Sequence, residues 1–227
     1  MIKWLEDAVF YEVYPQSFRD SNGDGIGDIP GITEKLEYIQ ELGCNALWIN
    51  PCFTSPFYDA GYDVEDYYSV APRYGTNEDL KKLFEAAHQR GMHVLLDLVP
   101  GHTAVTHPWF QESMKAEKNE YTDRYVWTDS LYKRMEDVKG IVSVLRGISP
   151  RPASCGVNCF STQPALNYGF ANITDAGWQQ PTDAPGPMAT REELKNIMRF
   201  WLTLGCDGFR VDTVSYTHLR AHETCAD

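Results

Sequence analysis

Apolar and polar residues follow two periods along this chain, and together they predict a series of strands and helices. Short apolar or alternating runs, the pattern of β-strands, occur around residues 9–14, 46–49, 93–99 and 208–211. Apolar residues three or four positions apart predict helices over 32–42, 77–90 and 191–204, with Asn77 as the cap of the second. Strands that alternate with helices are typical of an α/β fold with a parallel sheet.

A long segment, residues 103–190, interrupts this alternation. It is rich in Pro and Gly, has no sustained period, and contains Trp109, Trp127 and Trp178. Because such a length is too great for an ordinary loop between a strand and a helix, we expect a small inserted domain after the third strand. The α/β body then comprises residues 1–102 and 191–213.

Composition and charge narrow the class of partner. The 227 residues are 43% hydrophobic and carry a net charge of −12, without a Lys/Arg cluster, which argues against nucleic acid and anionic membranes as partners. No apolar leader precedes Asp7 and no apolar run reaches transmembrane length, so we expect no membrane contact and a cytoplasmic protein. The six cysteines are scattered, which favours free thiols.

A loop after the first strand has oxygen-bearing side chains at alternate positions. Asp20, Asn22, Asp24 and Asp28 fall at positions 1, 3, 5 and 9 of a calcium-loop pattern, and the carbonyl of Ile26 falls at position 7. Position 12 is Gly31 rather than a bidentate Glu, so a static, structural Ca²⁺ is predicted instead of a switch. The alternative is a metal-free loop of Asx-turns.

The chemistry of the last strand centres on Arg210 and Asp212. In the sequence Gly208-Phe209-Arg210-Val211-Asp212 the two charged residues are two positions apart, so their side chains point the same way from a strand. A neighbouring Arg keeps a carboxylate ionised, and an ionised carboxylate can attack a sugar carbon. An ordinary ion pair at a strand end is the alternative.

Two further places carry side chains suited to a sugar. The loop 55–63 combines tyrosines, which stack on pyranose rings, with carboxylates, which accept hydrogen bonds from hydroxyl groups. His102 follows the third strand, where a helix cap or a core histidine is the alternative interpretation. For the loop, the alternative is a surface segment with incidental tyrosines.

Taken together and in order, these motifs resemble those of the α-amylase superfamily of retaining glycoside hydrolases, in its α-glucosidase, oligo-1,6-glucosidase and trehalose synthase branches. The resemblance rests on residues 20–28, 60–63, 97–102, 163–168 and 208–212. It implies a TIM (β/α)₈ barrel, of which this chain holds the N-terminal half, about four βα units, with the insert 103–190 as the family's domain B.

The resemblance also implies roles for individual residues. Asp212 is the nucleophile that forms the glycosyl-enzyme, and Arg210 orients it. The residues implied in substrate binding are Tyr62, which stacks on the sugar, Asp63 and His102, which hydrogen-bond its hydroxyls, Asp97, which supports the same wall, and Gln163. The sequence departs from the family pattern at Ala165, where an acidic residue is common, and at Pro100-Gly101, where the family often has another residue and Asn. Both departures bear on substrate preference.

The implied activity is retaining hydrolysis of α-glucosidic bonds in short oligosaccharides. The alternatives are isomerisation of the trehalose synthase type and a non-catalytic family member. In this family the general acid follows the next strand, so we expect the chain as written to be inactive. Residues 214–227 resemble one reading frame of a sequencing adaptor and are expected to be a non-native tail.

Overall fold

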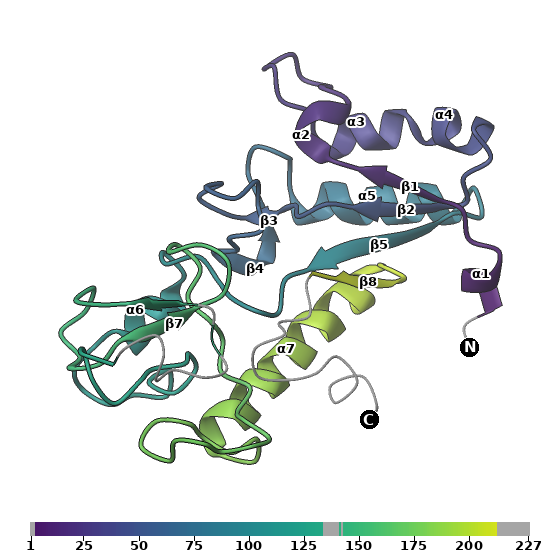
Figure 1. Cartoon of the computed structure of the whole chain (residues 1–227). Coiled ribbons are helices and arrows are strands. Elements are labelled where there is room, and N and C mark those ends of the chain that lie inside the picture. The colour runs from purple at the N-terminus through teal and green to yellow at the C-terminus, as the bar shows by residue number, and fades with distance from the viewer. Residues whose placement is uncertain (1–2, 134–140, 142, 213–227) are drawn as a thin grey trace. The chain divides into compact units, whose positions relative to one another are not determined.

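The structure is a computed structural model that describes residues 3–133, 141 and 143–212 (Figure 1). The chain divides into two compact units. Unit 1 comprises Met1–Thr54, Asp66–Leu98 and Ile197–Val211, and unit 2 comprises Ser55–Glu65, Val99–Asn196 and Asp212–Asp227. Unit 2 therefore contains the predicted insert 103–190 together with the loop around residues 55–65. The expected tail, 214–227, lies outside the described residues.

Unit 1 is built on a parallel four-stranded sheet. Its strands are β1 (Phe10–Val13), β2 (Ala46–Ile49), β5 (His93–Leu98) and β8 (Gly208–Val211), in the order β1-β2-β5-β8 (Figure 1). All three pairings are parallel. The four predicted strands and the α/β class are thus confirmed.

Helices alternate with these strands, as the sequence predicts, but several bounds differ. The helices of the first half are α1 (Lys3–Glu6), α2 (Pro15–Phe18), α3 (Ile29–Glu34), α4 (Leu36–Glu41) and α5 (Asn77–His88). The single helix expected over 32–42 is instead the pair α3 and α4, because Lys35 leaves helical geometry with φ −106° and ψ 8°. The last helix, α7 (Pro185–Leu204), begins before the expected residue 191.

The prediction that Asn77 caps α5 is wrong, because Thr76 is the cap. The hydroxyl of Thr76 accepts from the N–H of Asp79 and the Asp79 carboxylate accepts from the N–H of Thr76, a reciprocal capping box. Asn77 instead binds β4 (Asp66–Val70), donating to the carbonyl of Tyr68 and accepting from the N–H of Val70. β4 pairs in antiparallel fashion with β3 (Phe53–Thr54), a hairpin that the sequence pattern did not predict.

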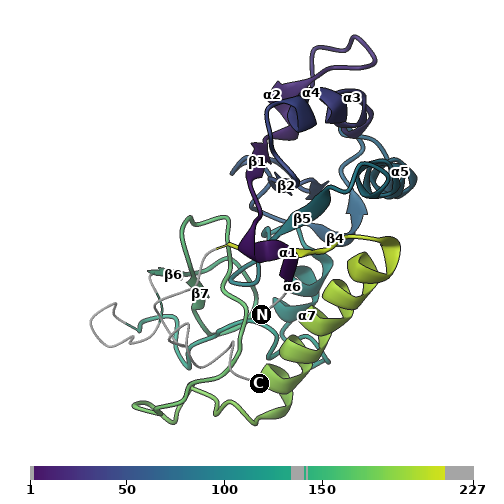
Figure 2. The same cartoon turned by 90° about the vertical axis from the view of Figure 1, so that its right-hand side faces the viewer.

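The core of unit 1 lies between the sheet and its helices. Figure 2 shows α3 and α5 packed beside one another and next to the strands. Their inward residues Ile32, Leu80 and Leu83 are fully buried, which is the apolar stripe that predicted them. Trp201 of α7 is also fully buried, stacks on Phe53, and donates from Nε1 to the carbonyl of Tyr67 at 2.7 Å.

Apart from the first part of α7, unit 2 has little regular structure, in line with the missing period of residues 103–190. Its short elements are α6 (Pro108–Ser113) and the antiparallel pair β6 (Ser143–Leu145) and β7 (Cys155–Val157). Aromatic clusters stabilise it, one around Phe110, Tyr125 and Trp127 and another around Phe170 and Trp178. Across the described part of the chain, no helix has both the length and the apolar character needed to cross a bilayer.

A half-buried carboxylate joins three segments of unit 1. Asp207, between α7 and β8, has one oxygen 2.9 Å from Nε2 of His88 and the other 2.9 Å from Nδ1 of His93. It also accepts from the N–H of Val94 at 2.8 Å, and Trp4 stacks on the His93 ring. Burial alone raises the pKa of Asp207, but these hydrogen bonds outweigh it and lower the pKa below its usual value.

We expect Asp207→Asn to lower the free energy of unfolding by about 1–3 kcal/mol at neutral pH, because it weakens hydrogen bonds to a charged acceptor. A lowered folded-state pKa contributes stability above the unfolded pKa of about 4, and this contribution is lost as pH falls through the folded value. Below pH 5, the difference between wild type and Asp207→Asn, measured by urea unfolding, should therefore shrink as the pH falls through about 4. A difference that grows on acidification below about pH 5 would contradict this account.

Candidate active site

Asp97 and Arg210 form an ion pair on the sheet of unit 1. They are register partners on β5 and β8, and Nη1 of Arg210 lies 3.0 Å and 3.2 Å from the two carboxylate oxygens of Asp97. Nε1 of Trp48, on β2, donates to the same carboxylate at 3.1 Å, and the guanidinium lies 4.6 Å from the centre of the Trp48 ring. Three adjacent strands thus hold one buried carboxylate, since the Asp97 side chain is 0% exposed.

The predicted role of Arg210, orienting Asp212, stays a prediction. The ion pair with Asp97 gives Arg210 a second function that local sequence did not indicate. Trp48 also binds the Asp97 carboxylate, whereas the sequence pattern identified it only as part of an apolar run. Its indole N–H, near the end of a strand, could have indicated a polar contact there.

In unit 2, the loop 55–63 is organised around Asp63. This carboxylate is fully buried and accepts from the hydroxyl of Ser55 and from the N–H groups of Tyr58 and Asp59, at 2.9 to 3.1 Å. Both its oxygens therefore hold the loop together. Its predicted contact with a sugar hydroxyl stays a prediction, and Tyr62 next to it is partly exposed.

The backbone of the same loop is strained at two non-glycine residues. Phe57 has φ 60° and Ala60 has φ 55°, in the left-handed region that side chains disfavour. Such conformations cost about 1–3 kcal/mol each and occur often at ligand-binding sites. The hydrogen bonds to Asp63 offset this cost, and one of them fixes the backbone of Tyr58. The backbone of Tyr62 is fixed by its own N–H, which donates to the carbonyl of Asp59 at 2.8 Å.

His102 is buried close to this loop within unit 2. Its Nε2 lies 3.1 Å from the carbonyl oxygen of Tyr62, and only 5% of the residue is exposed. Burial lowers the pKa of His102, against the opposing effects of that carbonyl and of the carboxylates of Asp212, Asp59 and Asp63. The imidazole is therefore neutral at neutral pH and suited to exchange hydrogen bonds with uncharged hydroxyls.

Gln163 and Asp59 connect the insert with the same loop. The amide of Gln163, which is fully buried, donates to Asp59 at 2.6 Å and accepts from the N–H of Phe160 at 3.0 Å. The carboxylates of Asp59 and Asp212 both raise the pKa of Cys159, after burial, which is the largest cause. Unit 2 therefore brings together His102, Asp59, Asp212 and the exposed thiol of Cys159.

Of the predicted site residues, Tyr62, Asp63, His102, Gln163 and Asp212 lie in unit 2, and Asp97 and Arg210 lie in unit 1. The sequence did not single out Asp59, although the carboxylates of its loop, residues 55–63, indicated that this segment binds a sugar. The five cysteines that the structure describes are all free, as predicted.

The predicted calcium loop, in unit 1, has oxygen donors in a compact turn. Asp20 accepts from the N–H groups of Gly23 and Gly25 at 2.6 and 2.8 Å, and these bonds, led by that from Gly25, lower the pKa of Asp20. Asn22 and Asp24 each accept from a backbone N–H two residues on.

Asp28 differs from the other donors because it caps α3. Its Oδ1 accepts from the N–H of Gly31, and its Oδ2 accepts from Ser21. The part of the chain that the structure describes contains no group of three or more His, Cys, Asp or Glu arranged to hold a metal. The donor chemistry of Asp20, Asn22, Asp24 and the Ile26 carbonyl suits a hard cation.

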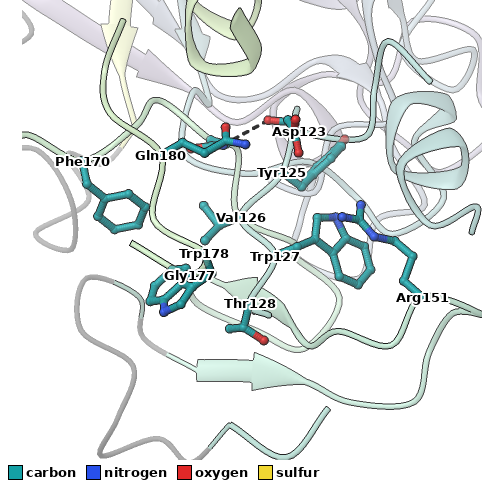
Figure 3. A pocket seen from close by; sticks show the side chains of 11 residues that line it. Asp123, Tyr125, Val126, Trp127, Thr128, Arg151, Phe170, Gly177, Trp178 and Gln180 are labelled. Carbon is teal, nitrogen blue, oxygen red and sulfur yellow. Dashed lines mark hydrogen bonds between the residues drawn. The ribbon is translucent and has the colours of Figure 1, made fainter. Parts of the chain in front are cut away.

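A separate cavity of about 170 Å³ lies within unit 2, and none of the predicted site residues lines it (Figure 3). Trp127 and Trp178 are among its lining residues, and the guanidinium of Arg151 lies 4.3 Å from the centre of the Trp127 ring. Asn167 donates to Gln180 at its wall. No predicted role falls on this cavity.

Comparison with known proteins gives consistent matches over nearly the whole chain. The family model described as the α-amylase catalytic domain matches residues 12–225. The trehalose synthase/amylase TreS of Mycolicibacterium smegmatis is 42% identical over 98% of this chain and 35% of its own length. The oligo-1,6-glucosidase of Parageobacillus thermoglucosidasius is 39% identical over 93% of this chain and 35% of its own length.

Among solved structures, the trehalulose synthase MutB of Pseudomonas mesoacidophila superposes with a TM-score of 0.78 at 38% identity, over 92% of this chain and 35% of MutB. The chain thus spans little more than a third of the relatives that it matches. The parallel sheet with its helices is the N-terminal part of a TIM barrel, as predicted. The family match, the relatives and the fold agree, and the chain belongs to the α-amylase catalytic-domain family.

Proposed function

We propose that the full-length protein containing this chain hydrolyses α-glucosidic bonds of short oligosaccharides with retention, through a covalent glycosyl-enzyme. The observation that supports this most is the proximity of Asp212 to the neutral, buried His102 within unit 2. In the proposal Asp212 attacks the anomeric carbon, His102 binds a sugar hydroxyl, and Tyr62 stacks on the ring. Retention also requires a second carboxyl group about 5–5.5 Å from the nucleophile, which acts as acid and then as base.

The test uses the full-length protein because the chain spans only about 35% of relatives such as TreS. Maltose, isomaltose and trehalose are supplied separately, and the products are followed by NMR, which reports the anomer first released. Release of α-glucose is expected, because two successive inversions return the original configuration. Release of β-glucose, or no reaction with any of the three sugars, would contradict the proposal.

Isomerisation of the trehalose synthase type is a second candidate. It is favoured by the 42% identity to TreS of M. smegmatis, against 39% for the oligo-1,6-glucosidase. The same nucleophile serves both reactions, and they differ in whether water or the released glucose completes the second step. Formation of trehalose from maltose in the same NMR assay distinguishes the two.

We also propose that the loop Asp20–Asp28 binds one structural Ca²⁺ through Asp20, Asn22, Asp24, Asp28 and the carbonyl of Ile26. A ligand that binds only the native state stabilises it, so a chelator should lower the melting temperature and added Ca²⁺ should restore it. Asp24→Ala, which removes one ligand, should abolish the Ca²⁺ response, whereas Asp183→Ala, at an exposed site elsewhere, should keep it. An unchanged melting temperature after chelation would refute the proposal.

An oligosaccharide is the proposed partner, and the cytoplasm is the proposed location. The free state of the five described cysteines supports a reducing compartment.

A further inference from the structure

Gly101, the residue before His102, is packed against the side chain of Asn158. A Cβ added to Gly101 would lie 2.7 Å from Nδ2 of Asn158, closer than van der Waals contact allows. The backbone of Gly101 itself does not adopt the left-handed conformation that favours glycine. It is therefore the carboxamide of Asn158, and not the local backbone, that requires glycine at position 101.

Asn158 holds the backbone at this point. Its Nδ2 donates to the carbonyl oxygen of Gly101 at 2.6 Å, and the same oxygen accepts from the N–H of Leu166 at 3.1 Å. The N–H of Asn158 donates to the carbonyl of Gln163 at 3.2 Å, so both the backbone and the side chain of Asn158 are held. A carbonyl oxygen needs a donor, which settles that the amide nitrogen faces Gly101.

This orientation leaves the other end of the carboxamide without a partner. Asn158 is 6% exposed, and its Oδ1 is buried and lacks a hydrogen-bond partner among the residues that the structure describes. A buried acceptor left unpaired costs about 1–3 kcal/mol. An apolar side chain could fill the same space without leaving a buried acceptor unpaired. The presence of asparagine here therefore indicates that its hydrogen bond to Gly101 has a function.

The peptide that Asn158 holds is the one that carries His102. The preceding carbonyl, that of Pro100, accepts from the hydroxyl of Tyr168 at 2.7 Å. Two side chains of unit 2 thus fix consecutive carbonyls immediately before His102, and the imidazole is held from its other side by the carbonyl of Tyr62. A shift of the Gly101 peptide would displace the imidazole directly.

We propose that Asn158 is a positioning residue for His102 and that it takes the place of the side chain that Gly101 lacks. Positions 101 and 158 then form one unit, in which a single carboxamide sets the orientation of His102 and so the affinity for the sugar. This inference rests on the proposed glycosidase function. It predicts that the carboxamide can be moved from one position to the other but cannot be lost or duplicated.

The test compares Asn158→Gly, Gly101→Asn and the double exchange in the full-length protein. Asn158→Gly removes the donor, and Gly101→Asn forces a Cβ against it, so each should raise KM by about 10-fold with a smaller change in kcat. The double exchange removes the clash and restores a carboxamide, so its KM should return to within about 3-fold of wild type. The matched control is Gly101→Asn combined with Asn172→Gly, at an exposed asparagine, which should not rescue KM.

Melting temperatures are measured on all variants. Additive losses of affinity in the double exchange would overturn the proposal, and so would a recovery of melting temperature without recovery of KM, since that result assigns the pair a structural role alone. A wild-type protein without glycosidase activity would instead refute the proposed function. An active wild type whose KM is indifferent to Asn158→Gly refutes the inference and leaves that function standing.

Discussion

Replacing Asp212 with asparagine is expected to lower kcat of the full-length enzyme by about 1000-fold or more, with the fold intact. An amide has no negative charge with which to attack the anomeric carbon, so the glycosyl-enzyme cannot form. The measurement is steady-state kinetics on the substrate identified by NMR, together with circular dichroism to confirm folding.

The matched control is Asp183→Asn, which makes the same chemical change at an exposed position in unit 2 and should leave kcat within about 2-fold. Turnover of Asp212→Asn close to that of the wild type would show that the catalytic carboxylate lies elsewhere.

The second large effect is expected on stability, from the pair of Asp97 and Arg210. Arg210→Met should lower the free energy of unfolding by about 3 kcal/mol, because it leaves the fully buried Asp97 carboxylate without its cation. Asp97→Asn combined with Arg210→Met should cost less than the sum of the two single changes, since neither charge is then left alone. Urea unfolding followed by tryptophan fluorescence measures all three.

Arg19→Met is the matched control for that experiment. Arg19 pairs with Glu34 at 3.1 Å in the same unit, but both side chains are about half exposed, at 45% and 49%. An exposed pair contributes less than about 1 kcal/mol, so this variant should be nearly neutral. Equal costs for Arg19→Met and Arg210→Met would contradict the role assigned to burial.

The sequence predicts the strands of unit 1 well because each is a local pattern. The apolar run 46–49 reports burial directly, since Ala46, Leu47 and Ile49 are fully buried. The alternation around Phe209 predicts β8 by its period alone, because Val211 is 49% exposed. The hairpin of β3 and β4 could not be found this way, since Phe53–Thr54 is only two residues long and shows no period. Similarly, Thr76 and Asn77 are both good caps, and only the three-dimensional partners of each distinguish them.

The candidate site shows the same division between local and distant information. Sequence identified Arg210 by its spacing from Asp212, but its ion pair with Asp97 depends on the register between β5 and β8, across 113 positions of the chain. The hydrogen bonds of Asp63 also depend on the folded loop, because its donors Ser55, Tyr58 and Asp59 become neighbours only after the chain turns back. The sequence shows which side chains are charged, but it does not show which groups they pair with in the fold.

The strained loop around Asp63 has a consequence for the thermodynamics of binding. Its backbone is fixed before any ligand arrives, with Phe57 and Ala60 held in a disfavoured conformation by bonds to one buried carboxylate. Ordering a mobile loop costs about 1–2 kcal/mol for each residue in backbone entropy. In this protein the loop is ordered when the chain folds, so a sugar that binds at Tyr62 should lose little free energy to ordering of the loop. The amides of Tyr58 and Asp59 should accordingly exchange slowly with deuterium even in the protein without ligand.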